Sequence, residues 1–332
     1  MTRALVDGVR RVLRAPALLA GVYLITLLTA IPLAIALHGA IEGHLGSSVA
    51  ADTAAQGVNW MWWEEFRSQA TGVSSTFGPQ ILGFAAVLTN LSNIIDGSTP
   101  DGAIGLAVIA YLVAWTFFVG GVIDRLARQR RLSSVGFFAA CGTYFFRFCR
   151  LAVLAGAAYW VLFGPIHDWI LGDLYELATR GLTVERTSFL IRIVLYAVFG
   201  LLVLPVNLVV DYAKIRAVVE DRRSMVGAVL AAIRFIRRRP LPAVGLYALN
   251  AGVFVAVLAV YAIVAPAVGP TLWLTFVVGQ AYVVARVFAK LVFYASQTAY
   301  FQSQLAHAEY VAAPRPVWPD SPAAEAISGT TT

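Results

Sequence analysis

The fold class of this chain is decided by one segment without a charged side chain, AVGLYALNAGVFVAVLAVYAIVA, which spans residues 243–265. A helix of about 20 predominantly apolar residues crosses the roughly 30 Å hydrocarbon core of a bilayer. Of the 332 residues in the chain, 59% are hydrophobic and only 13% are charged, against about 25% charged in an average soluble protein. The composition excludes a soluble enzyme and a disordered chain, and it predicts a polytopic membrane protein.

Five further segments have the same length and character, so we predict an all-α bundle of six transmembrane helices. The first follows a basic N-terminal stretch, and its length favours an uncleaved anchor over a signal peptide, although the small residues Ala34 and Ala36 leave cleavage open. The shorter segment 81–95 contains two Asn residues, and we interpret it as a re-entrant or surface-lying helix. The six predicted spans cover residues 17–38, 103–124, 150–171, 189–210, 243–265 and 271–294.

The basic residues predict the orientation of the bundle. Nineteen of the 25 Lys and Arg residues lie in residues 3–14, 125–150 and 214–239 or at Arg315, on one side of the predicted spans, and only three lie in the opposite loops. Lys and Arg accumulate in cytoplasmic loops. We therefore predict a bacterial inner-membrane protein with both termini in the cytoplasm.

One long segment, 39–102, lies on the predicted outer side. It carries Trp60, Trp62 and Trp63, and because Trp concentrates at the membrane–water boundary, we expect an amphipathic helix over residues 55–70. The Pro-rich segment 311–332 is predicted to be a flexible cytoplasmic tail that follows a single transmembrane domain, 1–310.

The cytoplasmic segments resemble one another, which indicates an internal repeat. Residues 226–238 resemble 135–147, and residues 9–23 resemble 233–247. Each match precedes an odd-numbered span, so we predict three parallel two-helix units, each introduced by a basic cytoplasmic helix.

These basic helices have an amphipathic pattern. Val226, Val229 and Ile233 follow the spacing of one helix face, while arginines lie on another. A helix of this kind lies at the bilayer surface with its cations at anionic headgroups. The predicted headgroup ligands are Arg10, Arg14, Arg147, Arg234 and Arg238.

Ionisable residues also lie at the predicted inner ends of the spans. We consider a polar network or gate in which the acids and bases pair across the cytoplasmic mouth; the alternative is that long basic side chains extend to water beside carboxylates that are already hydrated. Asn207, Asn250 and Gln280 are expected to form hydrogen bonds between helices. The candidate network consists of Asp124, Asp211, Arg286 and Lys290.

No catalytic motif, phosphate-binding loop or metal-ligand spacing occurs in the sequence. We therefore predict no enzymatic activity, no cofactor, no metal and no nucleic-acid partner. His167 and Asp168 form an isolated pair on the predicted outer side, which we interpret as surface residues.

The layout resembles known bacterial proteins. The runs Asp-Tyr-Ala-Lys-Ile-Arg at 211–216 and Glu-Asp-Arg-Arg-Ser at 220–224, with the basic helices before the odd spans, are similar to YciC-type proteins and to the membrane domain fused to glycerophosphodiester phosphodiesterases. The phosphodiesterase catalytic domain is absent, so the resemblance implies a membrane layout and no activity. The sequence thus favours a non-enzymatic scaffold that organises anionic lipids or a protein partner, with a transporter or permease component as the alternative.

Overall fold

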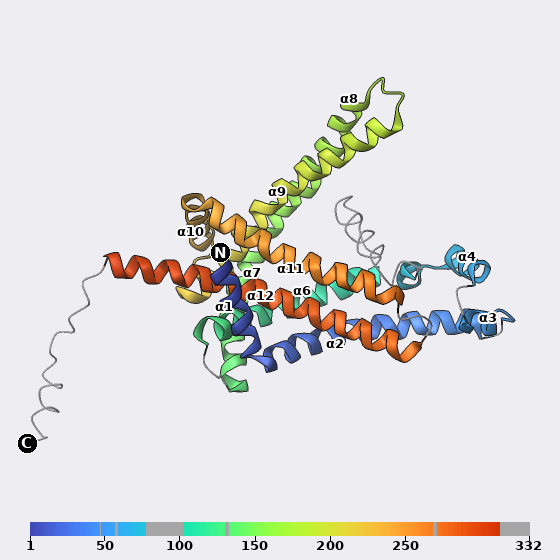
Figure 1. The fold of residues 1–332 in the computed structure, drawn as a ribbon, viewed down its shortest axis with the longest axis horizontal. Helices are drawn as coiled ribbons and strands as arrows, with labels where there is room; N and C mark the ends of the chain where they lie inside the picture. Colours follow the sequence, from blue (N-terminus) through green and yellow to red (C-terminus); the bar gives the residue numbers. More distant parts are fainter. Residues whose placement is uncertain (47, 57–58, 78–101, 130–132, 268–270, 313–332) are drawn as a thin grey trace, which may run out of the picture.

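The chain is helical, with no β-strand in the part whose structure is described (Figure 1). The structure is a computed structural model that describes residues 1–46, 48–56, 59–77, 102–129, 133–267 and 271–312. Six helices are long and apolar enough to cross a membrane, which confirms the predicted all-α polytopic bundle. They are α2 (Pro16–Leu45), α6 (Gly102–Arg128), α7 (Ser134–Val161), α9 (Glu185–Val219), α11 (Pro240–Ala267) and α12 (Leu272–Ala312).

Four of the long helices, α2, α6, α11 and α12, run side by side. The first half of α7 packs on α6, while the continuation of α7 and the first part of α9 lean away from the bundle as a pair (Figure 1). We call the end of the bundle that carries α1 (Thr2–Leu13) and α10 (Met225–Arg238) the basic end. The opposite, distal end carries α3 (Ala51–Gln56) and α4 (Trp60–Gln69). The basic end contains most of the tightly packed side chains.

Two proline residues separate the basic helices from the spans that follow them. The backbone leaves the helical region at Ala15, where φ is −130°, and at Arg239, where φ is −143°. A proline disfavours the helical conformation in the residue before it but fits the first turn of a new helix, so Pro16 and Pro240 begin α2 and α11. No proline occurs within α7, and the predicted basic helix at 134–148 is therefore the first half of one continuous helix.

The second and third predicted repeat units begin in the same way. The side-chain oxygen of Ser133 accepts a hydrogen bond from the backbone N–H of Gly136 at 3.2 Å, and that of Ser224 accepts one from Gly227, also at 3.2 Å. Each cap supplies an acceptor for one of the unpaired N–H groups of the first helical turn. In the first unit, α1 has no side-chain cap.

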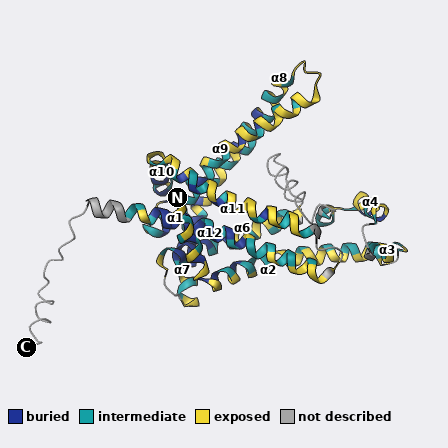
Figure 2. Cartoon of the chain, viewed as in Figure 1, coloured by how far each residue is buried: buried dark blue, intermediate teal, exposed yellow. Residues whose placement is uncertain are grey.

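The packed core lies at the basic end, and the spans become exposed beyond it. Ile123, Tyr212, Ile215 and Leu291 are fully buried there. Between this core and the distal end, many apolar side chains of the spans are exposed (Figure 2). Apolar helix surfaces without a protein partner are those that face lipid in a membrane protein.

Glycines permit the closest helix contacts in this core. The backbone of Gly8 on α1 lies so close to α12 that an added Cβ would be 2.7 Å from the backbone nitrogen of Ser296. On α6, a Cβ at Gly120 would be 2.7 Å from the Cβ of Tyr144 on α7. Small residues at helix interfaces allow this approach.

The leaning pair of helices has a small core of its own. The continuation of α7 passes through two π-helical segments, η3 (Leu162–Ile166) and η4 (Trp169–Leu174), and then α8 (Tyr175–Thr179). Ile170, Leu195 and Phe199 are buried together between this segment and α9. We call this part, residues 159–207, the diverging hairpin.

The tryptophan helix expected over residues 55–70 is α4. The outer segment, expected to begin at residue 39, begins later, because α2 continues to Leu45. Trp62 and Phe66 are buried, and the indole N–H of Trp62 donates to Nδ1 of His44 at 3.0 Å. The segment 81–95 and residues 313–332 of the predicted tail lie outside the described residues.

The three amides expected to join helices do so, which confirms that prediction. Each bonds to a side chain on a different long helix: α9 to α7, α11 to α12, and α12 to α2. Such bonds satisfy polar groups that cannot reach water within a bilayer. The pairs are Asn207 with Tyr159, Asn250 with Ser296, and Gln280 with Tyr23.

Candidate functional site

A cavity of about 510 Å³ lies among α2, α6, α9, α11 and α12. We call it the intramembrane cavity, since every residue that lines it belongs to a helix long enough to cross a membrane. Its volume lies within the range of about 300–1,000 Å³ typical of ligand pockets. The polar lining residues are Thr26, Tyr111, Asp211, Tyr247, Asn250, Arg286, Lys290 and Tyr294.

Lys290 on α12 is held in the cavity wall by aromatic side chains. Its Nζ donates to the hydroxyl of Tyr111 at 2.8 Å and lies 3.4 Å from the ring centroid of Trp115. The negative face of an indole ring attracts a cation. No carboxylate in the described part of the chain lies within ion-pair distance of this ammonium group, so its charge is oriented but not neutralised.

Asp211 on α9 is the one carboxylate among the described residues that line the cavity, and it already has a partner. Lys214, one helical turn along, lies 3.1 Å from the Asp211 carboxylate. The same ammonium is 5.7 Å from the ring centroid of Tyr294. Because Asp211 pairs with Lys214, Lys290 has no ion-pair partner of its own among the described residues.

Arg286 adds a second cation to the cavity. It lies one turn before Lys290 on α12 and is exposed, with its guanidinium 5.8 Å from the ring centroid of Tyr282. No ion pair of Arg286 is found within the described ranges. The intramembrane cavity therefore has a net positive charge, while Phe254, Val255 and Val283 supply an apolar wall.

The four residues of the predicted network are not brought together. Asp211, Arg286 and Lys290 line the intramembrane cavity, but Asp124 does not. The buried carboxylate of Asp124 accepts from Arg128 at 2.6 Å within α6. Each acid thus pairs within its own helix, and the expected pairing of acids with Arg286 and Lys290 does not occur among the described residues.

The predicted headgroup arginines have two kinds of surroundings. Arg10, Arg14, Arg234 and Arg238 are exposed at the basic end. Arg147 is only 14% exposed, because its guanidinium contacts the carboxylate of Asp221 at 2.6 Å. This hydrogen bond and the nearby positive charge lower the pKa of Asp221, which lies in the turn between α9 and α10.

The two separate basic helices contact the bundle with different faces. On α1, Val12 is buried and Leu5 and Val9 pack against the core, so its apolar face contacts protein instead of acyl chains. On α10 the small residues Ala228 and Ala232 are buried, whereas Val226 and Leu230 are 57% and 56% exposed. An apolar stripe beside arginines is therefore free on α10.

Arg11 is a buried cation at the basic end that was not predicted from the sequence. Its guanidinium donates to the carboxylate of Asp7 at 3.0 Å, to the backbone oxygen of Leu126 at 3.1 Å and to Gln302 at 2.7 Å. These bonds join α1 to the ends of α6 and α12. A signal was present in the sequence, because Gly8 and Arg11 share one face of α1 and Asp7 precedes Arg11 by one turn.

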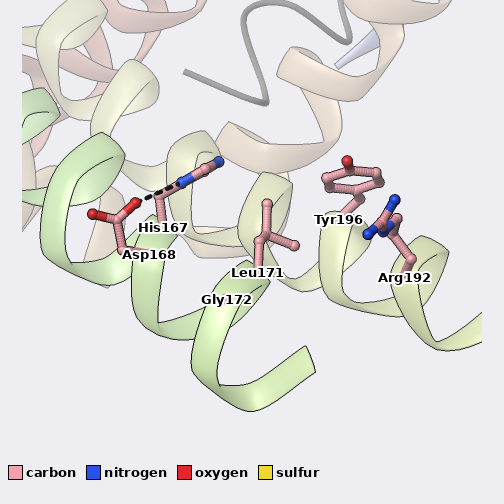
Figure 3. A pocket seen from close by; sticks show the side chains of 6 residues that line it. All are labelled: His167, Asp168, Leu171, Gly172, Arg192 and Tyr196. Carbon is pink, nitrogen blue, oxygen red and sulfur yellow. Dashed lines mark hydrogen bonds and ion pairs between the residues drawn. The ribbon is translucent and has the colours of Figure 1, made fainter. Parts of the chain in front are cut away.

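A second hollow, of about 470 Å³, lies in the diverging hairpin (Figure 3). His167 and Asp168 line one side, 3.3 Å apart, and Arg192 and Tyr196 of α9 line the other. No Ser, Thr or Cys lines this hollow in the part of the chain that the structure describes, so it lacks the nucleophile of a hydrolytic triad.

Arg192 is also held by an aromatic ring, since its guanidinium lies 4.5 Å from the ring centroid of Tyr175. Within the described ranges, no three His, Cys, Asp or Glu side chains are grouped as a metal site would require. No protein-family model, curated protein or solved structure matches this chain.

Proposed function

We propose that this integral membrane protein binds an anionic amphiphile in the intramembrane cavity and has no enzymatic activity. The observation that carries the proposal is the pair of cations, Lys290 and Arg286, that face one cavity without a carboxylate partner in the described chain. A charge within a bilayer is costly unless a counter-ion or water compensates it. An anionic headgroup supplies that counter-ion.

The other residues of the cavity fit an amphiphile better than a small ion. The apolar wall that includes Phe254 and Val283 offers a surface for an acyl chain. The Tyr111 hydroxyl and the Trp115 ring hold the Lys290 ammonium in place, so little side-chain freedom is lost when the ligand binds. The intramembrane cavity is thus a specific site for the lipid organisation that the sequence favours.

The proposal includes a location and an orientation. The accumulation of Arg at the basic end supports a bacterial inner membrane with that end in the cytoplasm, where anionic lipids attract Lys and Arg. The shared Ser133 and Ser224 caps support a repeat of the two later units. The free stripe of Val226 and Leu230 supports contact of α10 with that leaflet.

Replacement of the lysine tests the cavity. The protein is purified in a neutral detergent, and its thermal unfolding is followed with a thiol-reactive dye that reports exposure of the buried Cys141. We expect phosphatidylglycerol to raise the unfolding temperature of the wild type more than phosphatidylcholine does. In Lys290→Met the apparent affinity for phosphatidylglycerol should fall roughly 10- to 150-fold, since a hydrogen bond to a charged group contributes about 1.5–3 kcal/mol.

Arg180→Gln is the matched control, because Arg180 is an exposed arginine at the tip of the diverging hairpin. It should leave the affinity unchanged. An equal response of the wild type and Lys290→Met to phosphatidylglycerol would contradict the proposal, as would an equal response of the wild type to both lipids.

Transport is the second candidate, and the observation that favours it is that three of the four predicted polar residues line one cavity between spans. Reconstituted vesicles with fluorescent phosphatidylglycerol in both leaflets distinguish the two functions. Binding alone predicts that an external quencher removes half of the fluorescence, whereas lipid transport predicts loss of nearly all of it. Lys290→Met should abolish the additional loss.

A further inference from the structure

A third hollow lies at the basic end and shares no residue with the intramembrane cavity. It has a volume of about 690 Å³ and lies between α2, α6 and the start of α7. We call it the basic-end groove. A ligand in the basic-end groove would therefore be distinct from the one proposed for the intramembrane cavity.

The polar end of the groove is positively charged. Arg14, at the junction of α1 and α2, and Arg125 of α6 line it together with Ser133 and Ser134. No carboxylate is among the described lining residues, and neither arginine forms an ion pair within the described ranges. The first turn of α7 also begins here, and a helix N-terminus favours an anion.

The rest of the groove is apolar and is open on its outer side. Its walls include Gly21, Leu24 and Leu28 of α2 and Phe118 of α6. Leu24 and Leu28 are 54% and 61% exposed, and nothing lies within 4 Å of a Cβ built at Gly21. An elongated apolar ligand can therefore enter from the bilayer.

The length of the groove matches one leaflet. The apolar lining of α2 extends from Pro16 to Leu28, which is about 18 Å at 1.5 Å per residue. Half of the hydrocarbon core of a bilayer is about 15 Å. An acyl chain with its head at Arg14 therefore reaches approximately the middle of the membrane.

We propose that the basic-end groove holds one anionic phospholipid of the adjacent leaflet. Its phosphodiester contacts Arg14 and Arg125, and an acyl chain lies along α2 between Leu24, Leu28 and Phe118. The planar guanidinium groups suit a phosphate because each can donate two parallel hydrogen bonds. The lipid fills a space between α2 and α7 that the protein itself leaves open.

Native mass spectrometry after delipidation in detergent tests this site. Because the intramembrane cavity also binds an anionic amphiphile, all variants are made in the Lys290→Met background, in which we expect one phosphatidylglycerol or similar anionic phospholipid to remain bound. The double variant Arg14→Gln, Arg125→Gln should reduce its retention at least tenfold, and so should Gly21→Phe, which fills the apolar part of the groove. Inorganic phosphate at millimolar concentration should not displace the lipid, because it lacks the acyl chain.

Two controls separate this site from its surroundings. Arg3→Gln removes an exposed arginine of α1 that does not line the groove, and Arg180→Gln removes one from the diverging hairpin; both should retain the lipid. The arginine pair and Gly21→Phe act on different ends of the groove, so a folding defect in one still leaves the other as a test. Undiminished retention in either well-folded variant would overturn the proposal, and so would displacement by inorganic phosphate.

Discussion

Replacement of Arg11 should detach α1 from the bundle, whereas replacement of its neighbour Arg10 should not. Both are arginines on the same helix, but Arg11 is 8% exposed and Arg10 is exposed. Arg11→Met preserves an unbranched apolar side chain and removes every donor. It therefore isolates the contribution of the guanidinium contacts.

The magnitude follows from the three partners of Arg11. Asp7 is 45% exposed, so its ion pair contributes only about 0–1 kcal/mol. The backbone oxygen of Leu126 and the Gln302 side chain lie further inside, and each loses a hydrogen bond to a charged donor worth about 1.5–3 kcal/mol. Because Met also avoids the cost of burying a charge, we expect a net loss of about 2–4 kcal/mol.

Equilibrium unfolding in mixed micelles with a rising mole fraction of SDS measures this difference. Hydrogen exchange of the α1 amides provides a local readout, because they should exchange faster in Arg11→Met while the amides of α9 keep their protection. For Arg10→Met we expect a change within about 0.5 kcal/mol. Free energies of unfolding that agree within this margin for the two variants would refute the inferred role of Arg11.

Two further predictions concern packing and orientation. Gly8→Ala should destabilise the protein by about 1–3 kcal/mol in the same micelle titration, because its Cβ would meet the backbone of Ser296 at 2.7 Å. Gly43 lies in open space, so Gly43→Ala should leave the stability unchanged or raise it by up to about 1 kcal/mol. Equal effects of the two substitutions would contradict the close contact at Gly8. In a background without the native cysteines, Thr183→Cys should react with an impermeant maleimide in intact cells and Arg223→Cys only after permeabilisation, whereas the reverse pattern would overturn the predicted topology.

Hydropathy predicted the six spans because the bilayer imposes a minimum length of apolar helix on any chain that crosses it. The ends of the helices were less predictable. The helix at 134–161 is continuous since no proline interrupts it, and α2 extends to Leu45 because its last turns remain helical beyond the apolar segment. Hydropathy predicts neither the continuity of the helix at 134–161 nor the position at which α2 ends.

The candidate site was predictable only in part. Asp211, Arg286 and Lys290 were selected as ionisable residues within or at the ends of spans, and they do line one cavity. The aromatic support of Lys290 was missed, because Tyr111 and Trp115 lie far from it in sequence and resemble ordinary membrane residues. Pairing partners depend on helix rotation, which a single sequence does not fix.

The contact between α1 and α12 constrains the order in which the molecule can assemble. Gly8 and Arg11 lie in α1, which is synthesised before the other described helices, while Ser296 and Gln302 lie in the last described helix, α12. The earlier helices can enter the bilayer as they are made, and they supply Asp7 and the Leu126 oxygen, but the Gln302 side chain that also bonds Arg11 follows 291 residues later in the chain. Until α12 is made, α1 lacks most of the surface against which it is buried, so we expect nascent chains arrested before α12 to expose this segment to proteases.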